Sequence, residues 1–187
     1  MVGEIRDLET ADTAINAALT GHLMLSTIHT NSASGALPRF LSMGVKPFLL
    51  APSLNAIIGQ RLVRKICPHC KIEDAIEPER SEEIKKLLSE ISPASGETVP
   101  DFNNLKFFKG RGCEICNQTG YKGRIGIYEV FLMDDVIRAA MSENISEYQV
   151  QKLAIEQGMV TMGQDGLLKA LDGLTSVDEV FRATGGV

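Results

Sequence analysis

The chain has 187 residues, and 44% of them are hydrophobic, which is enough for one domain, or one domain and an added module, with a buried core. Its net charge is −5, from 19 basic and 24 acidic residues, whereas nucleic-acid-binding surfaces neutralise phosphates with an excess of lysine and arginine. Trp is absent and aromatic residues make up only 5% of the chain, so few side chains are available to stack on bases. We therefore expect no nucleic acid partner.

The sequence contains no run of about 18 uncharged apolar residues, which a membrane-spanning helix needs. A secretory signal begins with basic residues and continues with an apolar run, but the first 20 residues carry four acids. These acids are Glu4, Asp7, Glu9 and Asp12. We therefore expect a cytoplasmic protein.

The first 60 or so residues are apolar and low in charge, and their pattern predicts alternating strands and helices. Residues 1–5 resemble the end of a buried strand, and apolar residues recur on one helical face from Leu8 to Leu19. Gly21 ends this predicted helix. The run from His22 to His29 is short and apolar, which is typical of a buried strand in a largely parallel sheet. This order of elements indicates an α/β fold.

Two helices are predicted next. The first is capped by Asn31 or Ser32, and Pro38 inside it indicates a kink or a late start. The second starts near Pro47 or Pro52 and continues to the first cysteine. One side of this second helix would carry the apolar residues Leu54, Ile57, Ile58, Leu62 and Ile66.

The middle of the chain, residues 67–120, is rich in charged and turn-forming residues and reads as an inserted module. An acidic helix is predicted over residues 79–91, followed by a Pro/Ser/Gly linker over residues 92–100. Composition therefore divides the chain into a first part of residues 1–66, this module, and a last part of residues 121–187.

The last part begins with a predicted strand from Gly123 to Val130 and continues with short helices. Two of these helices have capping boxes at their start, Ser146 with Gln149 and Ser176 with Glu179. We expect a C-terminal helical region.

All four cysteines fall into two CxxC pairs, Cys67 with Cys70 and Cys113 with Cys116. Two thiolates three positions apart in a turn can bind one ion, and two such turns complete a closed tetrahedral site. A closed site is structural, so we predict structural zinc that joins the two ends of the module. Two disulfides are disfavoured in a reducing cytosol, and a redox CxxC needs only one pair. His69 is either an exposed turn residue or a replacement ligand.

Polar residues follow both predicted strands of the first part, and α/β sheets bind ligands beyond the carboxyl ends of their strands. A carboxylate such as Glu4 can orient water or Mg²⁺ at a phosphate, and an imidazole such as His29 can contact the transferred group. The alternative is that Asp7 caps the following helix and that His29 forms a hydrogen bond within its loop. Strand alternation places His22 and His29 on opposite faces, so they are not an obvious metal pair.

Four runs of sequence resemble the secretion ATPases, the hexameric motors of type II secretion and type IV pilus assembly. They are Gly3–Ala11, Thr20–Asn31, Gln60–Arg64 and Gly120–Val130. Together with the two CxxC pairs, they cover nearly the whole chain in the order typical of that family. The resemblance implies the C-terminal part of a RecA-like P-loop NTPase domain that carries an inserted four-cysteine zinc module.

By this resemblance, Gly3–Asp7 matches the Walker B segment, and Glu4 positions Mg²⁺ or the attacking water. The run Thr20–Asn31 matches the His box, in which His22 and His29 would link the nucleotide state to the neighbouring subunit or to the phosphate. The implied catalytic residues are Glu4 and His29, and the implied nucleotide-binding or coupling residues are Arg6, His22 and Thr27. Gly3 stands at the usual Walker B Asp position, so metal contact through water is expected.

The chain contains no Gly-x-x-x-x-Gly-Lys-Ser/Thr loop, and in this family that loop lies upstream of Walker B. The resemblance therefore implies the C-terminal portion of a longer homo-hexameric motor, which uses ATP and Mg²⁺ and is inactive as this portion alone. Its implied partner is the platform protein of a secretion or pilus machine, on the cytoplasmic side of the inner membrane. The alternative is a zinc-stapled docking module of such a machine that hydrolyses nothing.

Overall fold

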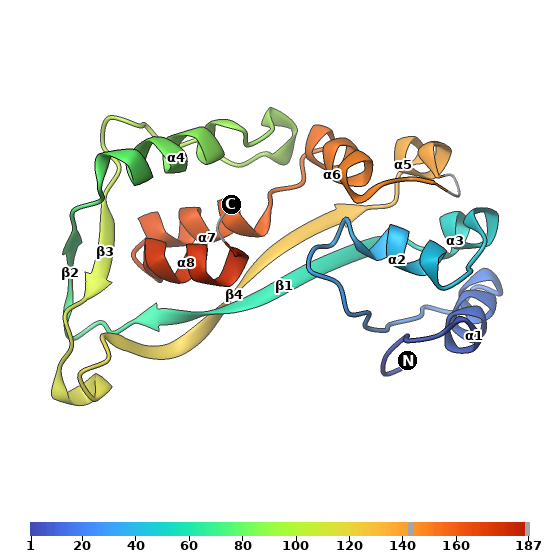
Figure 1. Cartoon of the computed structure of the whole chain (residues 1–187), viewed down its shortest axis with the longest axis horizontal. Helices are drawn as coiled ribbons and strands as arrows, with labels where there is room; N and C mark the ends of the chain where they lie inside the picture. The colour runs from blue at the N-terminus through green and yellow to red at the C-terminus, as the bar shows by residue number, and fades with distance from the viewer. Residues whose placement is uncertain (142–143, 186–187) are drawn as a thin grey trace. The chain divides into compact units, whose positions relative to one another are not determined.

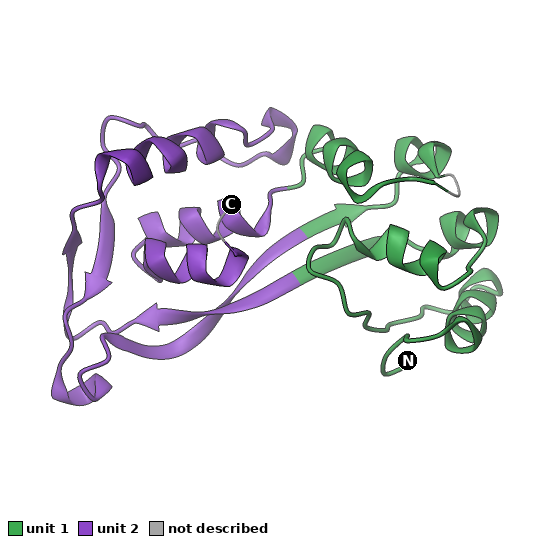
Figure 2. Ribbon diagram, in the orientation of Figure 1, with its two compact units in different colours: residues 1–59, 130–159 green, residues 60–129, 160–187 purple. Residues whose placement is uncertain are grey.

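The computed structural model describes residues 1–141 and 144–185 (Figure 1). Contacts divide the chain into two compact units (Figure 2). Unit 1 consists of Met1–Gly59 with Val130–Met159, and unit 2 of Gln60–Glu129 with Val160–Val187. No helix within the described residues has the length and apolar character needed to cross a membrane. The division at residues 66 and 120 that composition suggests stays a prediction.

Unit 1 begins with helix α1, Leu8–Leu19, where the apolar pattern predicts it. The Asp7 side chain caps the helix by accepting a hydrogen bond from the Thr10 backbone N–H at 2.8 Å. Ala11, Ala14 and Ile15 form its buried face. Both the helix and the capping role of Asp7 are confirmed.

The two strands predicted before and after α1 are not formed in the described residues. The segments are extended and lie side by side, because the N–H groups of Val2 and Ile5 donate to the carbonyl oxygens of Leu25 and Thr27. Strands of a parallel sheet are buried by helices that pack on both faces of the sheet, and neither segment belongs to a sheet of the described residues. Leu23 and Leu25 are 81% and 60% exposed, so their predicted burial is wrong.

Helices α2, Ala36–Ser42, and α3, Pro47–Ser53, follow. The late start of α2 agrees with the prediction from Pro38, but the predicted cap at Asn31 or Ser32 is wrong, because the N-cap residue is Gly35 and no side chain caps the helix. The predicted continuation of the next helix to Ile66 is wrong, because Leu54 is already extended and Ala56–Ile66 forms strand β1. β1 pairs with strand β4, Tyr121–Leu132, which covers the strand predicted at Gly123–Val130.

Unit 1 ends with helices α5, Asp135–Ala140, and α6, Glu147–Glu156. Helix α6 has the predicted capping box, in which the Gln149 N–H donates to Ser146 Oγ and the Ser146 N–H donates to Gln149 Oε1. The core of unit 1 joins apolar side chains of α1, α2, α3, α5 and α6. This core holds the segments that carry the candidate site described below.

Unit 2 contains an antiparallel pair of strands, β2, Lys71–Asp74, and β3, Phe107–Gly110. Helix α4, Pro78–Ser89, lies where the acidic helix is predicted. Helices α7, Met162–Leu171, and α8, Val177–Thr184, complete the unit, together with the short 3₁₀ turns η1, Pro93–Ser95, and η2, Glu114–Cys116. One core contains residues of α4, β3, α7 and α8, so the module between the cysteines packs with the C-terminal helices.

Only half of the second predicted capping box is formed. Ser176 Oγ accepts from the Glu179 N–H at 3.3 Å, as expected. The Glu179 side chain turns away from Ser176 and binds Arg64 on β1 and Arg182 on α8. The side chains of Arg64 and Arg182 therefore take the place of the Ser176 backbone N–H as partners of the Glu179 carboxylate.

Candidate functional site

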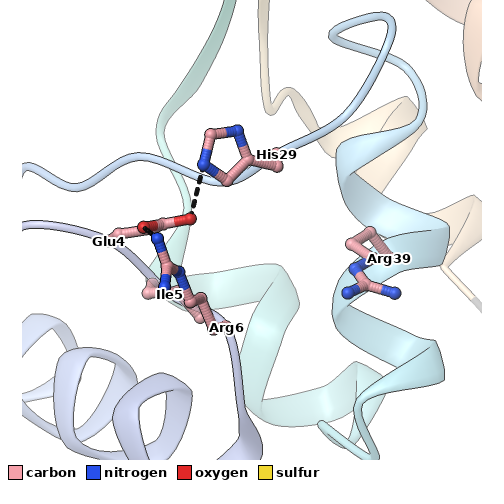
Figure 3. Close-up of a pocket in the computed structure, with 5 residues that line it drawn as sticks. All are labelled: Glu4, Ile5, Arg6, His29 and Arg39. Carbon is pink, nitrogen blue, oxygen red and sulfur yellow. Dashed lines mark ion pairs between the residues drawn. The ribbon is translucent and has the colours of Figure 1, made fainter.

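The candidate site lies where the two extended segments of unit 1 run side by side (Figure 3). Thr27 Oγ1 donates to the Gly3 carbonyl oxygen at 2.8 Å, and the Ile5 N–H donates to the Thr27 carbonyl oxygen at 2.9 Å. These two hydrogen bonds fix the register of the segments. As a result Glu4 on the first segment faces His29 on the second, with Glu4 Oε1 2.6 Å from His29 Nε2.

Glu4 is an anionic group held between two cationic or potentially cationic ones. Its Oε2 lies 2.5 Å from Arg6 Nη2. The hydrogen bond from Arg6, followed by the charges of Arg6 and His29, lowers the pKa of Glu4 against the opposing effect of burial. Glu4 is therefore a carboxylate at neutral pH, with a side chain that is 20% exposed, whereas those of Arg6 and His29 are 75% and 84% exposed.

The Oε1 atom of Glu4 is buried and has no hydrogen-bond partner among the described residues. Its contact with His29 is therefore one of proximity and charge. A buried carboxylate oxygen in this position remains able to accept a hydrogen bond. The site thus has an acceptor at its base and positive charge at its rim.

A pocket of about 270 Å³ opens beside this group, lined by Glu4, Ile5, Arg6, His29 and Arg39. Figure 3 shows Arg39 on α2, across the pocket from the other charged side chains. The Arg39 guanidinium has no ion-pair partner in the part of the chain that the structure describes. The pocket is smaller than a typical small-molecule site, and its cationic rim suits a group such as phosphate.

Sequence reasoning did not single out Arg39. Arg39 lies on α2 and lines the pocket together with Glu4. The available signal was an arginine ten residues after His29, on the helix that follows a strand-end site.

Two of the predicted site residues lie outside the pocket lining. Thr27 uses its hydroxyl to tie its segment to Gly3. His22 lies at the end of α1, with Nδ1 3.1 Å from Thr20 Oγ1 and 3.2 Å from the Ala17 carbonyl oxygen. The structure therefore brings together Glu4, Arg6 and His29 and leaves His22 apart from them.

The four cysteines form a cluster in unit 2, with all sulfur atoms within 4.8 Å of one another. The Sγ atoms are 3.9 Å apart for Cys67 and Cys113, 3.9 Å for Cys70 and Cys116, and 3.6 Å for Cys113 and Cys116. A tetrahedron of four Zn–S bonds of about 2.3 Å has sulfur atoms about 3.8 Å apart, whereas a disulfide needs about 2.05 Å. The cluster therefore fits one tetrahedral ion and does not contain disulfides.

The backbone around the cluster favours the thiolate form of Cys116. The N–H groups of Cys113 and Gly120 donate to Cys116 Sγ at 3.2 and 3.3 Å. Burial alone raises the pKa of Cys116, but these donors and the neighbouring thiols outweigh it and lower the pKa to about 6. Burial raises the pKa of Cys70 to about 12. N–H groups that donate to a metal-bound sulfur stabilise its negative charge.

Glycines let the two cysteine turns approach each other. A Cβ on Gly110 would overlap the Gly120 carbonyl group, and Gly120 itself has a φ of +78°. The Cys67 N–H donates to the Gly120 carbonyl oxygen at 2.9 Å, which links the two turns directly. His69 is exposed and is not one of the four clustered ligands.

Comparisons with known proteins identify relatives of this chain. The chain is 44% identical over 184 residues to the type IV pilus assembly ATPase PilB of Thermus thermophilus, and the aligned region covers 98% of this chain and 20% of that protein. It is 45% identical over 184 residues to type II secretion system protein E of Pseudomonas aeruginosa, and the aligned region covers 98% of this chain and 34% of that protein. The chain thus spans between a fifth and about a third of the length of these curated relatives.

A solved structure has a similar fold. The X-ray structure of the Legionella pneumophila ATPase DotB matches with a TM-score of 0.63 and 19% identity, over 100% of this chain and 38% of that one. The likeness shows an α/β fold shared with that ATPase. The model of the family described as Type II/IV secretion system protein matches residues 1–182. By that match and by the identity to its relatives, the chain belongs to the type II/IV secretion system protein family.

Proposed function

We propose that this chain is the C-terminal part of a hexameric, RecA-like ATPase that couples ATP hydrolysis to the assembly of a pseudopilus or type IV pilus. The observation that carries the proposal is the Glu4 carboxylate, held between Arg6 and His29 at the base of a pocket with a cationic rim. Relatives named as a type IV pilus assembly ATPase and as type II secretion system protein E support this proposal.

In this proposal Glu4 orients the attacking water or a water-bound Mg²⁺, and Arg6, His29 and Arg39 bind phosphate oxygens. ATP supplies the phosphoryl group, and Mg²⁺ neutralises its charge. The carboxylate and guanidinium groups present fit these ligands. Both Glu4 oxygens face a basic side chain before ligand binds, so an incoming anion would compete for Arg6 and His29 and release the carboxylate.

His22 and Thr27 have supporting roles in the proposal. Thr27 keeps the His29 segment in register with Gly3 through its hydroxyl group. His22 is exposed, follows the end of α1 and does not line the pocket, so it would be free to contact a neighbouring subunit. These two residues would couple the nucleotide to the motor rather than take part in the chemistry.

The cysteine module, residues 67–120, would bind one structural zinc ion through Cys67, Cys70, Cys113 and Cys116. The sulfur separations and the N–H donors to Cys116 support this assignment. The module would lie between a RecA-like segment, residues 1–66, and the return strand and helices of residues 121–187.

We place the whole motor in the cytoplasm at the inner membrane, bound to the platform protein of its machine and to no nucleic acid. The net charge of −5 disfavours nucleic acid, and the family membership favours a secretion or pilus machine.

The decisive test is Glu4→Gln in the complete ATPase chain, in which this sequence lies downstream of a phosphate-binding loop. We expect ATP to bind with parental affinity and hydrolysis to fall by a factor of at least about 100, because the amide is neither a base nor an anion. Binding is measured with a fluorescent ATP analogue and hydrolysis by phosphate release. Parental hydrolysis by the variant would remove Glu4 from the mechanism, and a parent protein without hydrolysis would favour the docking module.

A further inference from the structure

The short segment between His29 and α2 is anchored to α6 by one side chain. Ser32 Oγ donates to Glu147 Oε1 at 2.5 Å, and Glu147 lies in the first turn of α6. The same Ser32 oxygen accepts a hydrogen bond from the Gly35 N–H at 3.0 Å. The Gly35 N–H, the Ser32 hydroxyl and the Glu147 carboxylate thus form a row of two hydrogen bonds in which each bond polarises the other.

The packing around this chain is close. A Cβ on Gly35 would lie 3.1 Å from Ser32 Oγ and 3.4 Å from the carboxyl group of Glu147. Gly35 is also the N-cap residue of α2, which has no side-chain cap. The hydroxyl of Ser32 therefore satisfies an N–H at the start of α2 that the helix itself leaves unpaired.

The anchored segment connects two walls of the Glu4 pocket. His29 stands three residues before Ser32, and Arg39 stands one turn after the Gly35 cap on α2. Both side chains line the pocket, and neither Ser32 nor Glu147 does. A change at the anchor would therefore move both basic side chains relative to Glu4 without altering the pocket's own chemical groups.

We propose that Ser32 and Glu147 form a positioning pair that sets His29 and Arg39 around a phosphate-bearing ligand. The inference rests on the proposed ATPase function and extends it to α6, an element with no residue in the pocket. Neither residue touches the ligand. Their effect passes through the placement of His29 and Arg39.

The test compares variants of the complete ATPase chain. Ser32→Ala removes the hydroxyl, and Glu147→Ala removes the acceptor, so each is expected to lower kcat about fivefold with KM for ATP close to the parent value. Ser32→Thr keeps a hydroxyl and Glu147→Gln keeps an acceptor oxygen, so both should restore most of kcat. The matched control is Glu156→Ala at the exposed end of the same helix, which should leave kcat unchanged.

Amide hydrogen exchange, measured on the same proteins, reports on the anchor itself. We expect faster exchange at Gly35 and in residues 29–35 for Ser32→Ala and Glu147→Ala, and no change for Glu156→Ala. Parental kcat in both alanine variants would overturn the positioning role, and so would a Ser32→Thr protein as slow as Ser32→Ala. The ATPase assignment would still stand in either case if Glu4→Gln abolishes the hydrolysis that the parent protein shows. A parent protein as inactive as Glu4→Gln would overturn both.

Discussion

At the scale of single residues, the charge state of Glu4 is set mainly by one neighbour. The Arg6 hydrogen bond is the largest influence lowering the pKa of Glu4, and Arg39 on the other side of the pocket makes no contact with this carboxylate. We therefore expect Arg6→Gln to raise the pKa of Glu4 toward its ordinary value, and Arg39→Gln to leave it in place. A carbon-13 NMR titration of the glutamate carboxyl groups measures both.

This titration also tests which arginine belongs to Glu4. Because the pKa is lowered in the folded chain, the Arg6 contact adds stability at pH values above the ordinary Glu pKa, and this contribution is lost as the pH falls. A Glu4 pKa that moves equally in Arg6→Gln and Arg39→Gln would contradict the arrangement in Figure 3. It would indicate that Arg39 pairs with Glu4 in solution.

At the scale of elements, α8 is attached to β1 by a buried acid. The Glu179 side chain is 1% exposed and accepts hydrogen bonds from the side chains of Arg64 and Arg182 and from the Arg64 backbone N–H. Burial alone raises the pKa of Glu179, but these bonds outweigh it and lower the pKa to about 2. The carboxylate therefore holds the two elements together over the whole physiological range.

We expect Glu179→Gln to lower the free energy of unfolding by about 2 kcal/mol at pH 7, because it leaves two arginines with a weaker acceptor. Since the folded-state pKa of Glu179 is lowered, its contribution is complete above the ordinary Glu pKa and declines as the pH falls toward 2. The difference between parent and variant should therefore shrink at pH 3. Urea unfolding at both pH values measures it, with the exposed Glu82→Gln as control. Equal losses at pH 7 and pH 3 would contradict this reading.

The elements also show what local sequence can and cannot predict. Helices α1 and α6 were predictable because Asp7, Ser146 and Gln149 form their caps from neighbouring residues. β1 was not, because its apolar spacing also fits a helix and its partner β4 starts more than fifty residues later. In the site, Glu4 and His29 follow from their motifs, but Arg39 reaches the pocket through the fold of α2.

At the scale of the whole molecule, the cysteine cluster and the C-terminal helices belong to one unit. Residues of α4 and β3, which lie between the two CxxC pairs, share a core with α7 and α8. A zinc ion at the cluster would therefore close the loop between the two CxxC pairs and stabilise the packing of all these elements together. Losing the ion should affect the whole of unit 2 and not only the turns that bind it.

We expect the purified chain to contain one zinc ion, and Cys113→Ser or a strong chelator to lower the midpoint of thermal unfolding. A loss of about 5 kcal/mol corresponds to roughly 10 to 20 °C for a chain of this size. Zinc is measured by elemental analysis, and hydrogen exchange should rise in α4, α7 and α8 when the ion is removed. His69→Ala is the matched control, because its side chain is exposed beside the cluster and should leave the zinc in place. A stable chain that lacks metal and has four freely reacting thiols would contradict the zinc site, and the core of α4, α7 and α8 would then hold the unit together unaided.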